Sequence, residues 1–153
     1  MRAVLGYLLM GLLVVSIPAA QGQTRVNDKD VANLMRNLKE DAKKFKPMFN
    51  NAIKKSTIRK TSREKDAKNL VTSFANQTEA MLNNFKRTKK ADSDFSLVKS
   101  SATEIDKIVN EIKLDGEAAS MWQKIRTELD EVGSALGVSQ AAAASRRSGL
   151  HLI

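Results

Sequence analysis

The chain of 153 residues contains no cysteine and only one histidine. Without cysteine no disulfide can form, and zinc sites of the common kinds lack their sulfur and imidazole ligands. The one histidine, His151, is third from the C-terminus. The body of the chain therefore lacks the base that Ser–His–Asp and Cys–His nucleophiles use. We expect no catalytic residue, no metal ligand and no cofactor, and we predict that the protein is not an enzyme.

Proline and glycine are scarce, with 2 and 7 residues in the whole chain. Both residues interrupt helices, whereas the alanine, leucine, lysine and glutamate that are frequent between them favour helices. Without disulfides, stability has to come from buried apolar surface, which a chain of this length can supply. The composition therefore predicts an all-α protein with an apolar core.

The first residues, "MRAVLGYLLMGLLVVSIPAAQG" at 1–22, have the order of a secretory signal peptide. Arg2 precedes an uncharged, mostly apolar run over residues 3–17, and Pro18 and small residues follow. The run is shorter than the ~20 residues that span a bilayer. We predict an exported protein, periplasmic or extracellular, with no transmembrane helix in the mature chain. The alternative is an uncleaved membrane anchor.

Apolar residues then recur at steps of three and four, which places them on one face of each of four helices. The pattern predicts helices over 28–55, 62–89, 93–114 and 117–136. Pro47 falls inside the first range, but the pattern keeps its phase from Phe45 to Phe49. We therefore predict one kinked helix there. The alternative is a new helix with Pro47 in its first turn.

Local signals indicate where the helices begin and end. Thr61 followed by Glu64 is a capping-box pattern, and Asp92 or Ser93 is expected to cap the third helix. Gly116 can adopt the left-handed conformation of a helix end. Four helices with short connections predict an antiparallel four-helix bundle made of two helical hairpins. We assign 23–137 to this bundle domain and 138–153 to a disordered tail.

Trp122 is the only tryptophan and lies on the apolar face of the last helix. Large aromatic side chains at such positions belong to the core, so we predict a core aromatic. Arg126 follows one turn later, where its guanidinium can cover the indole face, and Asp130 follows at the next turn, where it can pair with Arg126.

The segment "W-x2-IR-x-EL-x2-V-x3-L" at 122–136 resembles the last helix of a group of small, exported, cysteine-free bacterial helical proteins. The segments "NLKEDAKKFKPMFNNAIKKS" and "LVTSFANQTEAMLNNF" are similar in spacing to the first two helices of that group. The resemblance covers about residues 28–138 and implies an exported helical fold. Because the group has no assigned activity, it implies no catalytic residue. Leu136 and the alanine-rich tail depart from the group's aromatic continuation.

Positive charge is concentrated in the first hairpin. Residues 25–60 hold eleven basic and four acidic residues, whereas residues 91–136 hold five basic and ten acidic ones. Because the first two helices are predicted to be longer, the connection between them should project beyond the second hairpin, away from its acidic residues. We call the candidate anionic-partner contact at this connection the basic tip. It consists of Lys54, Lys55, Arg59, Lys60 and Arg63.

The partner expected at such a surface outside the cytoplasm is an anionic envelope component or an acidic protein. Nucleic acid is not expected, because no aromatic residues are interleaved with the cations. We predict a non-catalytic cell-envelope interaction protein. The alternative is a periplasmic carrier or chaperone-like bundle that opens to bind apolar ligands.

Overall fold

The computed structural model describes residues 27–137, and these form four α-helices without any strand. The helices are α1 (Asp28–Ile53), α2 (Ser62–Thr88), α3 (Asp92–Glu111) and α4 (Gly116–Ala135). The predicted all-α four-helix bundle is confirmed. The predicted signal peptide (1–22), the tail (138–153) and His151 lie outside the described range.

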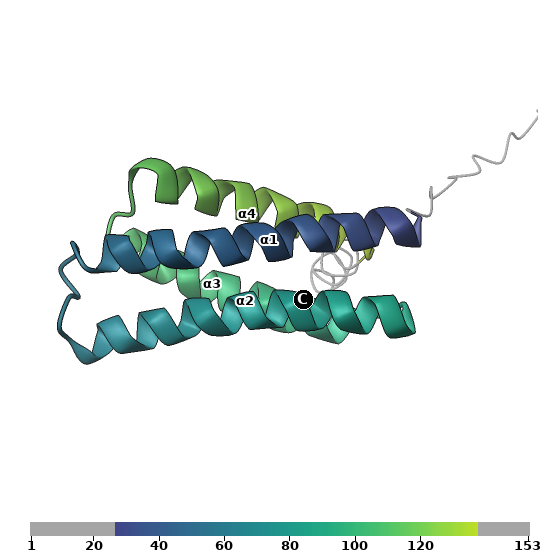
Figure 1. The fold of residues 1–153 in the computed structure, drawn as a ribbon, viewed down its shortest axis with the longest axis horizontal. Helices are drawn as coiled ribbons and strands as arrows, with labels where there is room; N and C mark the ends of the chain where they lie inside the picture. The colour runs from purple at the N-terminus through teal and green to yellow at the C-terminus, as the bar shows by residue number, and fades with distance from the viewer. Residues whose placement is uncertain (1–26, 138–153) are drawn as a thin grey trace, which may run out of the picture.

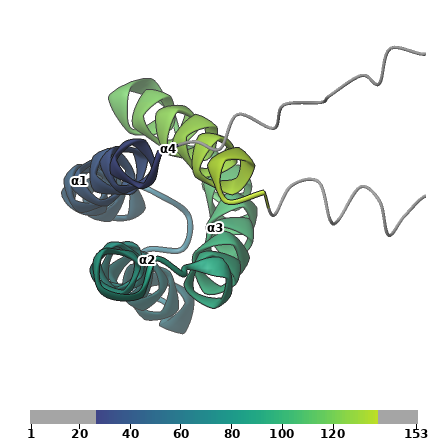
Figure 2. The ribbon, with the colours of Figure 1, turned by 90° about the vertical axis from the view of Figure 1, so that its right-hand side faces the viewer.

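Successive helices run in opposite directions along the long axis of the bundle (Figure 1). α1 packs against α2 and α4, and α2 packs against α1 and α3 (Figure 2). α3 and α4 contact each other far less than the other neighbouring pairs do. The two helices of the second hairpin, α3 and α4, are therefore held in place mainly by their contacts with α2 and α1 of the first hairpin.

The core contains the residues that the three- and four-residue spacing selects. Nine apolar residues of α1 follow this spacing, and two of them, Leu34 and Ala52, are only half-buried, which places them at the edge of the core. The other seven are buried: Val31, Met35, Leu38, Ala42, Phe45, Phe49 and Ile53. α2, α3 and α4 add Phe74, Phe85, Phe95, Ile105 and Ile125 to the same cluster.

Helix α1 continues through Pro47 without a break. The alternative, a new helix that begins at Pro47, is therefore wrong. Proline cannot donate a backbone hydrogen bond, but its ring is exposed on the outer side of α1 while Phe45 and Phe49 remain in the core. The apolar contacts on the inner side are thus kept on both sides of the proline.

The helix ends differ in detail from the expected caps. α3 begins at Asp92 with Ala91 at the N-cap, so neither Asp92 nor Ser93 is the cap. Ala91 is buried, which shows that packing of the connection overrides the usual preference for a polar cap. Gly116 has the expected left-handed φ, +57°, but it begins α4 and does not end α3. The left-handed residue after the end of α3 is Lys113, with a φ of +50°.

The first connection is built on a hydrogen-bond pattern different from a capping box. α2 begins at Ser62 with Thr61 as its N-cap, but the Thr61 hydroxyl donates to the Ile58 carbonyl at 2.5 Å. Glu64 accepts from the backbone N–H of Lys60 at 2.6 Å, not from that of Thr61. The predicted helix start is close to the observed one, but the predicted reciprocal bonds are absent.

None of the four helices between residues 27 and 137 is both long enough and apolar enough to cross a membrane.

Candidate functional site

The connection between α1 and α2 folds around one apolar residue, Ile58. Its side chain is 6 % exposed. The Ser56 hydroxyl donates to the Ile53 carbonyl at 2.8 Å, and Lys60 adopts a left-handed conformation with a φ of +61°. With Ile58 turned inward, the lysine and arginine side chains of the connection face outward.

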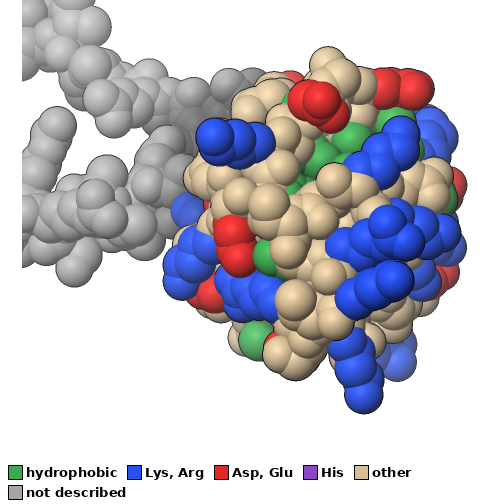
Figure 3. All heavy atoms as spheres, turned by 90° about the vertical axis from the view of Figure 1, so that its left-hand side faces the viewer, with side chains coloured by type: hydrophobic (Ala, Val, Ile, Leu, Met, Phe, Trp, Pro, Cys, Tyr) green, Lys and Arg blue, Asp and Glu red, His purple; other side chains and the backbone are tan. Residues whose placement is uncertain are grey.

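All five residues of the basic tip are exposed: Lys54, Lys55, Arg59, Lys60 and Arg63. The connection that carries most of them extends further along the bundle axis than the connection between α3 and α4 (Figure 1). A group of Lys and Arg side chains gathers on one side of this end of the molecule (Figure 3). The structure therefore places the candidate residues together on one projecting surface.

Arg63 differs from the other four tip residues because it has an acidic partner. Its Nη2 atom lies 3.0 Å from Glu111 Oε2, and its Nε atom donates to the same oxygen at 3.2 Å. The expectation that the tip lies away from every acid of the second hairpin is thus wrong for Arg63, because the last turn of α3 reaches the start of α2. Within residues 27–137, the other four tip cations form no ion pair.

Glu64 is the acid closest to the turn, and its charge is already engaged. It pairs with Lys68 and accepts the N–H of Lys60, and these two bonds hold the pKa of Glu64 below its usual value. An open hollow of about 460 Å³ lies beside it. Its lining contains three lysines and only one acid: Lys60, Thr61, Glu64, Lys65, Lys68 and Asn69. An anion that enters this hollow therefore meets mainly positive charge.

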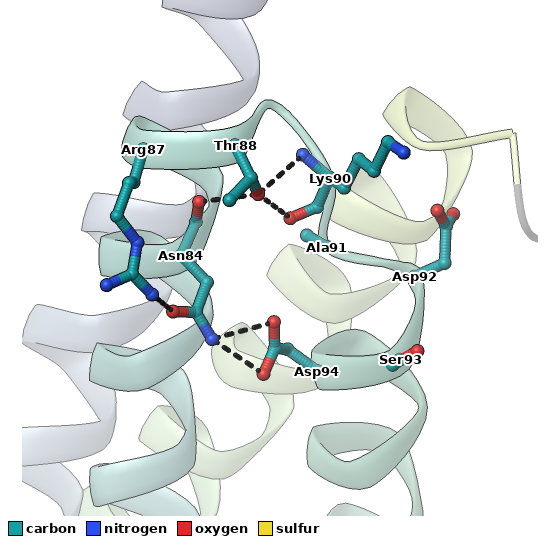
Figure 4. A pocket seen from close by; sticks show the side chains of 8 residues that line it. All are labelled: Asn84, Arg87, Thr88, Lys90, Ala91, Asp92, Ser93 and Asp94. Carbon is teal, nitrogen blue, oxygen red and sulfur yellow. Dashed lines mark hydrogen bonds between the residues drawn. The ribbon is translucent and has the colours of Figure 1, made fainter.

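A second hollow, of about 370 Å³, lies at the opposite end, where α2 meets α3 (Figure 4). Asn84 joins the two helices, because its Nδ2 atom donates to both carboxylate oxygens of Asp94 at 3.1 Å. Arg87 donates to Asn84 Oδ1 at 2.6 Å, and the Thr88 hydroxyl donates to the Asn84 carbonyl at 2.9 Å. These polar groups satisfy one another, so we interpret this end as a structural joint.

Trp122 is 1 % exposed and lies in the middle of the core. Its ring stacks on Phe45 with the centroids 5.0 Å apart, and Phe74 meets it edge-on at 5.8 Å. The indole N–H donates to Asp106 Oδ1 at 2.8 Å, so its polar atom is satisfied. This environment is that of a packed core side chain.

The neighbours of Trp122 differ from those expected. Phe45, and not Arg126, covers the indole face. Arg126 pairs with Asp106 at 3.2 Å, and Asp130 has no part in that ion pair. Asp106 therefore connects α3 to both Trp122 and Arg126 of α4.

A pair of buried carboxylates between α1 and α4 was not predicted from the sequence. Asp41 is 3 % exposed and Glu128 is 8 % exposed. Lys124 Nζ lies 2.5 Å from Asp41 Oδ2 and 3.7 Å from Glu128 Oε1, and Lys44 pairs with the other Asp41 oxygen at 3.2 Å. Glu128 Oε2 has no hydrogen-bond partner in the described part of the chain.

The two carboxyl groups have opposite pKa shifts. Burial together with the charge of Asp41 raises the pKa of Glu128 to about 7. Burial also acts to raise the pKa of Asp41, but the hydrogen bonds from Lys124 and Lys44 outweigh it and lower that pKa. The hydrogen bond with Asp41 in turn raises the pKa of Lys124. The pair therefore carries Asp41 as the anion, while Glu128 keeps its proton to a higher pH than an ordinary carboxyl does.

Between residues 27 and 137, no three or more His, Cys, Asp or Glu side chains come close enough together to hold a metal ion. The arrangements that stand out are the basic tip, the polar joint between α2 and α3, and the buried carboxylate pair. Comparisons of this chain with known protein families, with curated proteins and with solved structures found no match.

Proposed function

We propose that this protein is an exported, non-catalytic protein of the cell envelope that binds an anionic partner through its basic tip. The observation that supports the proposal is the state of Lys54, Lys55, Arg59 and Lys60. All four are exposed on a projecting surface, and none has an acidic partner within the described range. Unpaired surface cations that lie close together attract anionic surfaces and polymers, and salt weakens this attraction.

The alternative, a carrier or chaperone-like bundle, would bind apolar ligands with side chains that are now in the core. Its largest members, including Phe45, Phe49, Phe74 and Trp122, are at most 1 % exposed. Among the described residues the one large apolar side chain that is exposed is Leu97, at 58 %. No observation favours an apolar binding site over a closed bundle, so the anionic partner is the function we propose.

A charge-reversal experiment tests the proposal. The tip variant changes Lys54, Lys55, Arg59 and Lys60 to glutamate and keeps Arg63, which is paired with Glu111. The control variant makes the same change in net charge at exposed residues outside the tip: Lys29→Glu, Lys89→Glu, Lys90→Glu and Lys99→Glu. Binding to heparin-like polymer and to anionic vesicles is measured at about 0.15 M salt, where only close contacts escape screening.

We expect the tip variant to lose binding and the control variant to keep most of it. Equal losses in the two variants would mean that overall charge, and not the tip, attracts the partner. Unchanged binding by the tip variant would show that the tip is not the site. Circular dichroism of both variants checks that each is still helical.

A further inference from the structure

A second group of cations runs from the tip along the outer side of the contact between α1 and α2. We call this group the basic seam. It consists of four residues of α1 and three of α2: Arg36, Lys39, Lys43, Lys46, Lys65, Lys68 and Lys86.

The spacing of these residues places them on one side of each helix. Arg36 and Lys43 are seven residues apart on α1, as are Lys39 and Lys46, and seven residues make nearly two full helical turns. On α2, Lys86 and Glu79 have the same separation.

One cross-helix contact sets the register of the seam. Lys43 of α1 reaches Glu79 of α2 at 3.3 Å. Arg36 lies two turns before Lys43 on α1, and Lys86 lies two turns after Glu79 on α2. Because α1 and α2 are antiparallel, Arg36 and Lys86 therefore lie alongside each other. In the other direction the seam leads to Lys65 and the basic tip.

Most of the acids on the seam are already neutralised. Glu79 pairs with Lys43, Glu40 pairs with Lys39 at 2.8 Å, and Glu64 pairs with Lys68. Over residues 27–137, no acidic side chain pairs with the four other seam cations, which are Arg36, Lys46, Lys65 and Lys86. The seam therefore adds to those of the tip four cations that have no acidic partner in the described range: Arg36 and Lys86 at its far end, and Lys46 and Lys65 nearer the tip.

The length of this surface indicates the shape of its partner. Arg36 and Lys54 are separated by 18 residues of α1 and its cap, which is about 27 Å at the helical rise per residue. A single anionic group can neutralise a few cations at the tip, but it cannot reach the far end of the seam. A linear polyanion can contact both ends at once.

The surface chemistry narrows the class of polymer. Single-stranded nucleic acid is held largely by stacking on aromatic side chains. All five phenylalanines and Trp122 are buried, so the described surface offers no aromatic platform. Membrane-surface helices insert apolar side chains among the lipids, but the exposed Leu97 is on α3, away from the seam. Six of the seven seam cations are lysines, which act as point charges on flexible stems.

We propose that a linear anionic polysaccharide lies along the basic seam and continues over the basic tip. This inference rests on the proposed function, because the tip supplies one end of the surface. It adds a partner of defined class and shape, and it assigns binding to Arg36 and Lys86, which lie about five and six helical turns away from the tip.

The test compares two double variants, each of which removes two exposed positive charges. The seam variant is Arg36→Gln with Lys86→Gln, and the control is Lys99→Gln on α3 with Lys113→Gln just after it, which are exposed and have no ion pair in the described range. Arg36 and Lys86 have no acidic partner within the described range, so their neutralisation breaks no ion pair there. The probes are polygalacturonate, dextran sulfate, digalacturonate, single-stranded DNA and anionic vesicles, with neutral dextran as a blank.

We expect the full-length chain to bind the long polysaccharides more tightly than digalacturonate. The seam variant should weaken long-chain binding by roughly three- to tenfold, as expected for the loss of two exposed charge contacts, and should change digalacturonate binding by less than about twofold. The control variant should bind both as the unmodified protein does.

The inference is overturned if the seam variant binds long polysaccharides as tightly as the control variant. If the tip reversal described above still abolishes binding in that case, the proposed function stands and only the seam is excluded. Tighter binding of DNA or vesicles than of either polysaccharide, with the same loss in the seam variant, would overturn the assigned class of partner. If the tip reversal has no effect, the proposed function fails.

Discussion

At the scale of single residues, Trp122 connects the most elements of the bundle. Its ring contacts Phe45 of α1 and Phe74 of α2, and its indole N–H donates to Asp106 of α3. Because all four helices meet at this side chain, its removal leaves a cavity that no single helix can close by a small shift.

We therefore predict that Trp122→Ala lowers the free energy of unfolding by about 3–5 kcal/mol. Trp122→Phe keeps an aromatic ring against Phe45 but loses the hydrogen bond to Asp106. We expect it to lower the free energy of unfolding by about 1–2 kcal/mol. Urea unfolding followed by circular dichroism measures both. As a control, Leu97→Ala removes an exposed side chain and should change stability by less than about 0.5 kcal/mol. A loss below about 1 kcal/mol for Trp122→Ala would contradict its role in the core.

Glu128 leads to a prediction about pH. In the unfolded chain its carboxyl titrates near 4.5, whereas burial beside Asp41 raises its pKa to about 7 in the folded state. Between these values the folded state binds more protons than the unfolded state, so the stability that protonated Glu128 provides is lost as the pH rises through about 7. The lowered pKa of Asp41 acts only at more acidic pH, below the ordinary aspartate value of 3.8, and does not mask this effect.

Glu128→Gln removes the titration and keeps the shape of the side chain. We expect the variant to be more stable than the unmodified protein at about pH 8, by about 1–3 kcal/mol, and to match it near pH 5. Urea unfolding at the two pH values measures the difference. Asp130→Asn, at an exposed residue of α4 whose charge is not among those that shift the pKa of Glu128, is the control and should leave the pH dependence in place. An unaltered pH slope in Glu128→Gln would show that another group titrates.

At the scale of helices, the apolar spacing was sufficient to predict four elements and most of their buried faces. The spacing is informative because residues three and four positions apart lie on the same face of a helix, and the apolar face is the one that packs on the core. The continuity of α1 through Pro47 followed from the same argument, since Phe45 and Phe49 stay in phase. The caps were harder, because they depend on tertiary contacts. Ala91 is the N-cap of α3 since it is buried in the connection.

The same limit explains the polar residues that the sequence did not reveal. Asp41 and Glu128 each precede a buried apolar residue, so the apolar pattern alone cannot show whether they are inside or outside. Their burial depends on α1 and α4 packing together across more than eighty residues of sequence. The Arg63–Glu111 pair joins α2 to α3 across 48 residues and was missed for the same reason. The exposure of the tip lysines was predictable because they are charged and do not belong to the apolar pattern of either helix.

At the scale of the whole molecule, charge is divided between the two hairpins. The basic tip and the basic seam both lie on α1, α2 and their connection. By contrast, ten of the seventeen acidic residues lie on α3, α4 and their connection. Few ion pairs join the two hairpins: Arg63 with Glu111 and Lys124 with Asp41. The positive charge of the first hairpin is therefore largely left facing solvent, while the apolar residues of both hairpins face each other.

The closed core leads to a last prediction, which separates the proposed function from the carrier alternative. Nile red is an uncharged apolar dye, so the basic tip does not attract it electrostatically. Because the core residues are almost fully buried, we expect the native protein at neutral pH to cause little increase in dye fluorescence. Trp122→Ala should increase it, since loosened packing exposes apolar surface. Strong dye binding by the unmodified native protein would instead indicate a bundle that opens, and the carrier would then be the better interpretation.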